Sequence, residues 1–259
     1  MRLWEASSLV FFGYIIAIAL ASRRLTSRRR LIVFGGAAIG AALVGASVVW
    51  PLPKLLTEWL LPPAALLIAY WTSGLLFVAP DPTAEAALVK IDSSLRVREL
   101  AKRLPNWLTE VLEFAYAAVY PAIPVALILY LVYTAAPDAS QFWAVVLVTD
   151  FICFAVLPWV QTRAPRCLEP RPPWRARFRR VNLMLVGSAS TGVNTFPSGH
   201  AAEALAAALL LSHAPLPVFL CMLVVALAIS AGAVLGRYHY AADAIAGWGV
   251  AAVVWGLIC

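Results

Sequence analysis

The chain has 259 residues, of which 63% are hydrophobic and only 13% are charged, and its formal net charge is +7 at pH 7. Soluble domains have about 45–50% apolar and about 25% charged residues. The composition therefore excludes a water-soluble globule and a nucleic-acid-binding chain. It is typical of an all-α, polytopic membrane protein whose basic loops face anionic lipid.

A membrane-spanning helix needs about 20 mostly apolar residues, and eight stretches of the sequence qualify. They cover residues 7–22, 31–50, 61–79, 112–134, 141–160, 198–213, 217–235 and 243–259, with approximate ends. The first stretch ends near a sequence that resembles a signal-peptide cleavage site, but the five arginines within 23–30 favour an uncleaved anchor. We therefore expect a bundle of about eight transmembrane helices.

Two features of the N-terminal half bear on packing. Gly36 and Gly40 form a GxxxG pattern in the second span, which allows close helix packing. Packing within the chain is the simpler expectation, and a homo-oligomer through these glycines is the alternative. Segment 83–104 mixes helix formers with eight charged side chains, which fits either an amphipathic helix at the membrane surface or a solvated connector.

The basic residues are distributed unevenly between the two sides of the predicted bundle. With eight spans, one side holds the loops 23–30, 80–111, 161–197 and 236–242, which contain 18 of the 20 lysines and arginines. The positive-inside rule then places these loops in the cytoplasm and both termini outside.

The sixth span begins with a motif suited to an anion. Ser198 fits a helix N-cap, and Gly199 lets the backbone approach a ligand closely. The free N–H groups and dipole of a helix N-terminus attract negative charge, and His200 could exchange a proton there. The plain alternative is a capped helix with a histidine at the interface.

A second motif follows the seventh span. His239 and Asp243 are four residues apart and share one face of a helix. The carboxylate can hold one imidazole nitrogen and leave the other as a nucleophile or a base. Arg237 can bind two phosphate oxygens at once. The alternative is an interfacial ion pair.

The loop after the fifth span carries seven arginines. Arg163, Arg166 and Arg171 lie nearest the span and could reach a site at the membrane surface, whereas positive-inside charge explains the others better. Because spans six and seven cross out and back, His200 and His239 return to one membrane face. The arginine loop opens on that same face.

Two carboxyl groups lie inside predicted spans. Asp150 stands near the middle of the fifth span, where a charge is costly, so we expect it to be neutral and hydrogen-bonded. Glu203 lies one turn after His200 and could line the cavity or bond a neighbouring helix. The four cysteines show no CxxC spacing, and only three histidines are present, so the sequence predicts no metal site.

Together the motifs resemble those of the type-2 phosphatidic acid phosphatase superfamily of membrane lipid phosphatases. Residues 197–200 match its Pro-Ser-Gly-His motif, and Arg237, His239 and Asp243 match its third motif. Gly236 stands where the family usually has a serine. The shortened spacing between Arg237 and His239 is similar to the branch of inositol phosphorylceramide and sphingomyelin synthases.

The family's first motif is matched less well. Arg171 and the proline after it fit its end, but Ala164 stands where the family has a lysine. Arg163, one residue earlier, is one candidate replacement. Arg166 is the other, because the stretch before it resembles the Pro-Thr-x-x-Pro region of the synthase branch. The sequence leaves this choice open.

The resemblance implies an activity and an organisation. Residues 80–259 would form a catalytic domain with a six-helix core, and residues 1–79 would add N-terminal transmembrane helices. His239 would attack phosphorus to form a phosphohistidine, Asp243 would orient it, and His200 would protonate the leaving oxygen. Neither a metal nor a cofactor is implied.

The implied phosphate-binding residues are Ser198, Gly199, Arg237 and the first-motif arginines. The implied reaction is hydrolysis of a lipid phosphate or diphosphate, and the alternative is head-group transfer to a lipid alcohol by the same chemistry. The expected partners are the lipid substrate and the bilayer. The expected location is the cell membrane, with the active site on the cytoplasmic face.

Overall fold

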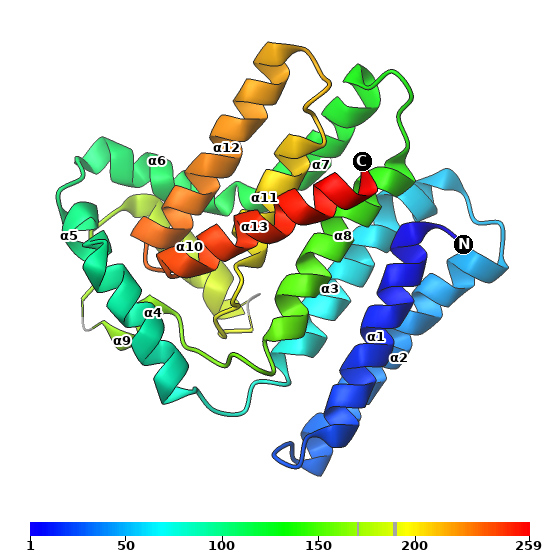
Figure 1. Cartoon of the computed structure of the whole chain (residues 1–259), viewed down its shortest axis with the longest axis horizontal. Coiled ribbons are helices and arrows are strands. Elements are labelled where there is room, and N and C mark those ends of the chain that lie inside the picture. The colour runs from blue at the N-terminus through cyan, green and yellow to red at the C-terminus, as the bar shows by residue number, and fades with distance from the viewer. Residues whose placement is uncertain (170, 189–190) are drawn as a thin grey trace.

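A computed structural model describes residues 1–169, 171–188 and 191–259. Within these residues it is a bundle of helices without strands (Figure 1), and the predicted all-α polytopic fold is confirmed. The helices are α1 (Leu3–Ala21), α2 (Ser27–Val49), η1 (Leu55–Leu60, a π-helix), α3 (Leu61–Gly74), α4 (Pro82–Ser94), α5 (Val97–Lys102), α6 (Asn106–Ala117), α7 (Val119–Tyr133), α8 (Ala139–Val156), α9 (Pro165–Leu168), α10 (Arg177–Ser188), α11 (Gly199–Leu209), α12 (Leu216–Leu235) and α13 (Ala241–Ile258).

Five helices in the described residues, α1, α2, α8, α12 and α13, are long and apolar enough to cross a membrane. The pair α6 and α7, bent by 65°, adds a sixth if it counts as one span. The spans expected over 61–79 and 198–213 are shorter in the structure, because α3 has 14 residues and α11 has 11. Helix α3 continues directly from η1.

The GxxxG pattern packs inside the chain. A Cβ atom at Gly40 would collide with the Phe12 ring of α1, and one at Gly36 would collide with Thr72 of α3. Helix α2 therefore lies against both neighbours through its glycines, and α1 and α2 form a hairpin at one edge of the bundle (Figure 1).

Segment 83–104 is helical but bends. Helix α4 ends before Arg96, which adopts a left-handed conformation with φ 51°, and α5 starts after it. Three side chains of α4 are buried, namely Glu85, Leu88 and Asp92. Their i, i+3, i+7 spacing forms one helix face, and α4 packs with this face toward α13.

Helix α11 lies at the centre of the C-terminal half and contacts α7, α8, α12 and α13. Alanines make up most of its buried face, and small side chains let neighbouring helices approach closely. Gly247 of α13 lies tightly against the start of α11, since a Cβ atom there would lie 2.6 Å from the Ser198 carbonyl oxygen. This contact fixes the N-terminus of α11 against α13.

Candidate active site

The two histidine motifs meet where the N-termini of α11 and α13 adjoin. The Ser198 backbone N–H donates to the Asp243 carbonyl oxygen at 2.9 Å. The imidazole rings of His200 and His239 lie 6.0 Å apart, centroid to centroid. The structure therefore brings the two predicted catalytic histidines to one place.

His239 is held by Asp243. Its Nδ1 lies 3.4 Å from the Asp243 Oδ2 atom, which also accepts the Tyr240 backbone N–H at 2.9 Å. Asp243 is fully buried. The His239 Nε2 atom has no hydrogen-bond partner in the described part of the chain. A carboxylate at Nδ1 fixes the tautomer that leaves Nε2 with a free lone pair.

His200 lies among aromatic rings. Tyr116 stacks on it at 5.6 Å, and Tyr120 meets it edge-on at 6.0 Å. Ser198 is the N-cap of α11, and its Oγ atom accepts the Ala201 backbone N–H. The cap leaves the N–H groups at Gly199 and His200 free of that bond, at the positive end of the helix.

A narrow cavity joins these groups. Its volume is about 20 Å³, which is room for about one water molecule, so a phosphoryl group would displace some of the side chains around it. The side chains that line the cavity are Tyr70, Tyr116, Tyr120, Arg166, Val186, Val193, Thr195, His200, Tyr238 and His239.

The structure separates Arg163 from Arg166. Arg166 lines the cavity, and its guanidinium lies 5.6 Å from the centre of the Tyr238 ring. Arg163 instead forms an ion pair with Glu85 at 2.8 Å, outside the cavity. The Arg163 guanidinium holds the pKa of Glu85 below its usual value. Arg171 lines a separate, wider pocket.

Arg237 does not line the cavity. Its buried guanidinium pairs with Asp92 of α4 and with Glu169. Its backbone is left-handed, with φ 65°, at a helix end where glycine is the usual residue. The Arg237 carbonyl oxygen accepts the backbone N–H of Arg166 at 3.0 Å. Arg237 therefore bears on the site through Arg166 and through the turn before His239.

Asp92 was not singled out from the sequence. One of its oxygens pairs with Arg237, and the other accepts the Ala241 backbone N–H at 2.9 Å, at the start of α13. The signal was present, because Glu85, Leu88 and Asp92 follow a helical period. The eight charged side chains of segment 83–104 instead suggested a helix at the membrane surface or a solvated connector.

Glu113 of α6 is the centre of a buried network. Its carboxylate accepts hydrogen bonds at 2.7–2.8 Å from the side chains of Trp174, Arg179, Asn182 and Tyr238. Burial and the Glu113 carboxylate raise the pKa of Tyr238, so the phenol keeps the proton it donates. Tyr238 stacks on Tyr116 at 4.1 Å, and Tyr116 stacks on His200.

Asp150 and Glu203 lie behind the cavity and do not line it. A Cβ atom at Gly199 would lie 2.9 Å from Asp150 Oδ1. The Asp150 side chain is buried, with its Oδ2 atom unpaired among the described residues, and Glu203 lies near enough to interact with it. The glycine of the motif therefore makes room for a carboxyl group in α8.

A steric restriction also explains why glycine stands at position 236. A Cβ atom there would lie 2.5 Å from the Gly232 carbonyl oxygen and 2.7 Å from the Tyr238 ring. The serine that is usual in the resembled motif would not fit beside this tyrosine. Among the described residues, no three His, Cys, Asp or Glu side chains gather closely enough to hold a metal ion.

The family model of the PAP2 superfamily matches residues 85–257. The matched range holds all the cavity residues except Tyr70, which comes from α3. No curated protein and no solved structure matches the chain.

Proposed function

Because the chain belongs to the PAP2 superfamily, we propose that it is an integral membrane phosphohydrolase. Its substrate is a lipid phosphate or diphosphate, and its intermediate is a phosphohistidine. The observation that carries the proposal is the cavity in which His239, oriented by Asp243, faces His200 and Arg166. A nucleophile with its orienting carboxylate, a second histidine for proton transfer and a fixed positive charge are the parts that phosphoryl transfer needs.

The reaction proceeds in two displacements. The His239 Nε2 lone pair attacks phosphorus, the bond from phosphorus to the lipid oxygen breaks, and protonated His200 gives its proton to that oxygen. Neutral His200 then takes a proton from water as the water oxygen attacks phosphorus. The phosphorus–nitrogen bond breaks, inorganic phosphate leaves, and both histidines return to their starting state.

Arg166 and the N-terminus of α11 stabilise the charge on the phosphoryl oxygens. In this proposal Arg166 contacts those oxygens directly, together with the backbone N–H groups of Gly199 and His200 at the helix N-terminus that Ser198 caps. Arg237 positions Arg166 and the turn before His239. Arg163 has a structural role through Glu85.

The test is phosphate release by the purified full-length protein, in detergent and EDTA, from a panel of lipid mono- and diphosphates. His239→Gln and His200→Gln are measured in parallel, with folding checked by circular dichroism. We expect wild-type release and a loss of at least about 10³-fold in either variant. Release that survives in folded His239→Gln would show that the nucleophile is wrong.

Head-group transfer to a lipid alcohol is the second candidate. The single residue between Arg237 and His239 favours it, since that spacing resembles the synthase branch. The narrow cavity, with room for about one water, favours hydrolysis. Phosphate release without any added alcohol supports hydrolysis, and turnover that requires a lipid alcohol supports transfer.

The proposed location is the cell membrane, with the active site on the cytoplasmic face. The five long apolar helices make the chain a membrane protein. The distribution of 18 of the 20 lysines and arginines supports the cytoplasmic orientation. Substrates in the inner leaflet would reach such a site directly.

A further inference from the structure

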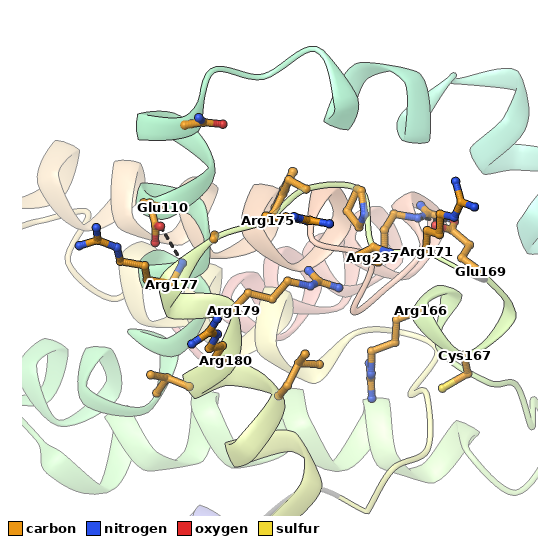
Figure 2. A pocket seen from close by; sticks show the side chains of 17 residues that line it. Glu110, Arg166, Cys167, Glu169, Arg171, Arg175, Arg177, Arg179, Arg180 and Arg237 are labelled. Carbon is orange, nitrogen blue, oxygen red and sulfur yellow. Dashed lines mark hydrogen bonds and ion pairs between the residues drawn. The ribbon is translucent and has the colours of Figure 1, made fainter.

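A second, much larger pocket adjoins the catalytic cavity. Its volume is about 1200 Å³, and Arg166 lines both spaces. Its wall comes from α6, which contributes Glu110, and from α9, the loop after it, α10 and the turn before α13 (Figure 2). We call this pocket the arginine vestibule, after the seven arginines that line it: Arg166, Arg171, Arg175, Arg177, Arg179, Arg180 and Arg237.

The positive charge of the arginine vestibule is largely uncompensated. Arg179 is paired with Glu113, and Arg237 is paired with Asp92 and Glu169. The other five guanidinium groups have no carboxylate within ion-pair distance in the described part of the chain. These are Arg166, Arg171, Arg175, Arg177 and Arg180.

The wall of the arginine vestibule is held in place by hydrogen bonds to two carboxylates of α6. The Trp174 indole N–H donates to Glu113, so the loop between α9 and α10 is fixed on α6. Glu110 accepts the backbone N–H groups of Arg177 and Phe178 at the start of α10. Loop arginines that served only to orient the chain in the membrane would need no such anchoring.

We propose that the arginine vestibule binds a further anionic group on the polar part of the substrate. The substrate class is therefore a lipid phosphate with a polyanionic head, which is a diphosphate or a head group that carries additional phosphate. This inference rests on the proposed function and narrows it. No bond changes in the vestibule, whose arginines bind and orient the head while phosphorus reacts at His239.

Three arguments lead to this class. One phosphoryl group at His239 is served by Arg166 and the α11 N-terminus, which leaves four unpaired arginines without a role at phosphorus. Guanidinium groups bind phosphate oxygens in pairs. The pocket volume of about 1200 Å³ is far larger than one phosphate needs and fits a whole polar head.

The first experiment measures binding without catalysis. Full-length protein in phosphatidylcholine nanodiscs is titrated with inorganic tripolyphosphate, and with inorganic phosphate for comparison, by calorimetry at constant ionic strength. The variant is R175Q/R177Q/R180Q. The matched control is R23Q/R24Q/R28Q, which removes the same charge from exposed arginines around the α1–α2 turn.

We expect the vestibule variant to bind tripolyphosphate at least about tenfold more weakly, with a smaller change for inorganic phosphate. The control should bind as the wild type does. Equal weakening in both variants would show that the total positive charge of the protein, and not the vestibule, causes the effect. Either that result or unchanged binding in the vestibule variant would overturn the proposal.

The second experiment measures kcat/KM for a lipid diphosphate and for phosphatidic acid. The vestibule variant should lose about tenfold on the diphosphate, mainly in KM, and little on the monophosphate. The assay is repeated with phosphatidylglycerol in the nanodiscs. If bilayer lipid occupies the vestibule instead, phosphatidylglycerol changes wild-type rates on both substrates and the variant loses that response, which overturns the proposal.

The two proposals fail separately. If no lipid releases phosphate, the hydrolase assignment fails, while the tripolyphosphate titration still decides whether the vestibule binds polyanions. If phosphate is released but the variant and the control behave alike in both assays, the hydrolase stands and the vestibule inference is wrong.

Discussion

Arg163 and Arg166 lie three residues apart in one loop, yet their side chains have different partners. Arg166 lines the cavity with both histidines, and Arg163 is paired with Glu85. We expect Arg166→Gln to lower kcat/KM by about 10²–10³-fold, since it removes the charge that the proposed mechanism places at the phosphoryl oxygens. Arg163→Gln should lower it less than about tenfold. Steady-state kinetics on one substrate checks both, and equal losses would contradict the assignment.

A second prediction at the residue scale concerns the contribution of Glu113 to stability. Glu113→Gln replaces the carboxylate that compensates the buried Arg179 and accepts four side-chain hydrogen bonds. Breaking a buried ion pair costs about 3–5 kcal/mol, so the melting temperature in detergent should fall by several degrees. Tyr238→Phe, which removes one of these bonds, should cost about 1 kcal/mol. A Glu113→Gln protein as stable as wild type would show that the network is not structural.

How far the sequence predicts these residues depends on the range of their contacts. His200, His239 and Asp243 were singled out from local motifs, and the structure brings these three residues together, while their proposed roles stay predictions. Glu113 could not be assigned this way, because its partners lie 61 to 125 residues away. Nor could the choice between Arg163 and Arg166, since it depends on Glu85 in a different helix.

At the scale of elements, the contact between the N-terminus of α11 and helix α13 sets the distance between the two histidines. Gly247→Ala would place a Cβ atom 2.6 Å from the Ser198 carbonyl oxygen, so α11 must shift. We expect activity to fall by about tenfold or more, as small displacements of reacting groups are costly. Gly249→Ala on the same helix has open space around it and should keep wild-type activity. Matched loss in both variants would assign the effect to helix flexibility instead.

The lengths of the elements were predicted unevenly. Long apolar runs gave α1, α2, α8, α12 and α13, because a membrane span needs continuous apolar sequence. The bend between α6 and α7 and the break at Arg96 were not expected. The bend stands just before Pro121, which has no backbone N–H with which to continue the helix from α6. The left-handed conformation of Arg96 is one that arginine adopts rarely on its own.

At the scale of the whole molecule, helix α3 contributes to the candidate site from outside the range of the family match. Tyr70 of α3 lines the catalytic cavity, although the family match begins only at residue 85. The Tyr70 hydroxyl also accepts the backbone N–H of Thr191, in the segment that leads into α11. Helix α3 therefore supports one wall of the cavity through Tyr70.

The orientation of the whole molecule is testable with its own cysteines. Cys167 is exposed beside Arg166, and Cys259 is exposed at the C-terminal end of α13, while Cys153 is buried. If α13, one of the long apolar helices, crosses the membrane, Cys259 and the candidate active site lie on opposite sides of it. If the basic loops are cytoplasmic, an impermeant maleimide applied to intact cells should label Cys259 and spare Cys167.

Two variants distinguish the labelling of Cys167 from that of Cys259. In both, Cys221 is also replaced by alanine, because it is exposed too. One keeps Cys167 as its reactive thiol through Cys259→Ala, and the other keeps Cys259 through Cys167→Ala. Permeabilised cells provide the control, since Cys167 must react there to show that its thiol is accessible. Labelling of the Cys167 variant in intact cells, with protection of the Cys259 variant, would place the active site outside. Substrates would then have to come from the outer leaflet.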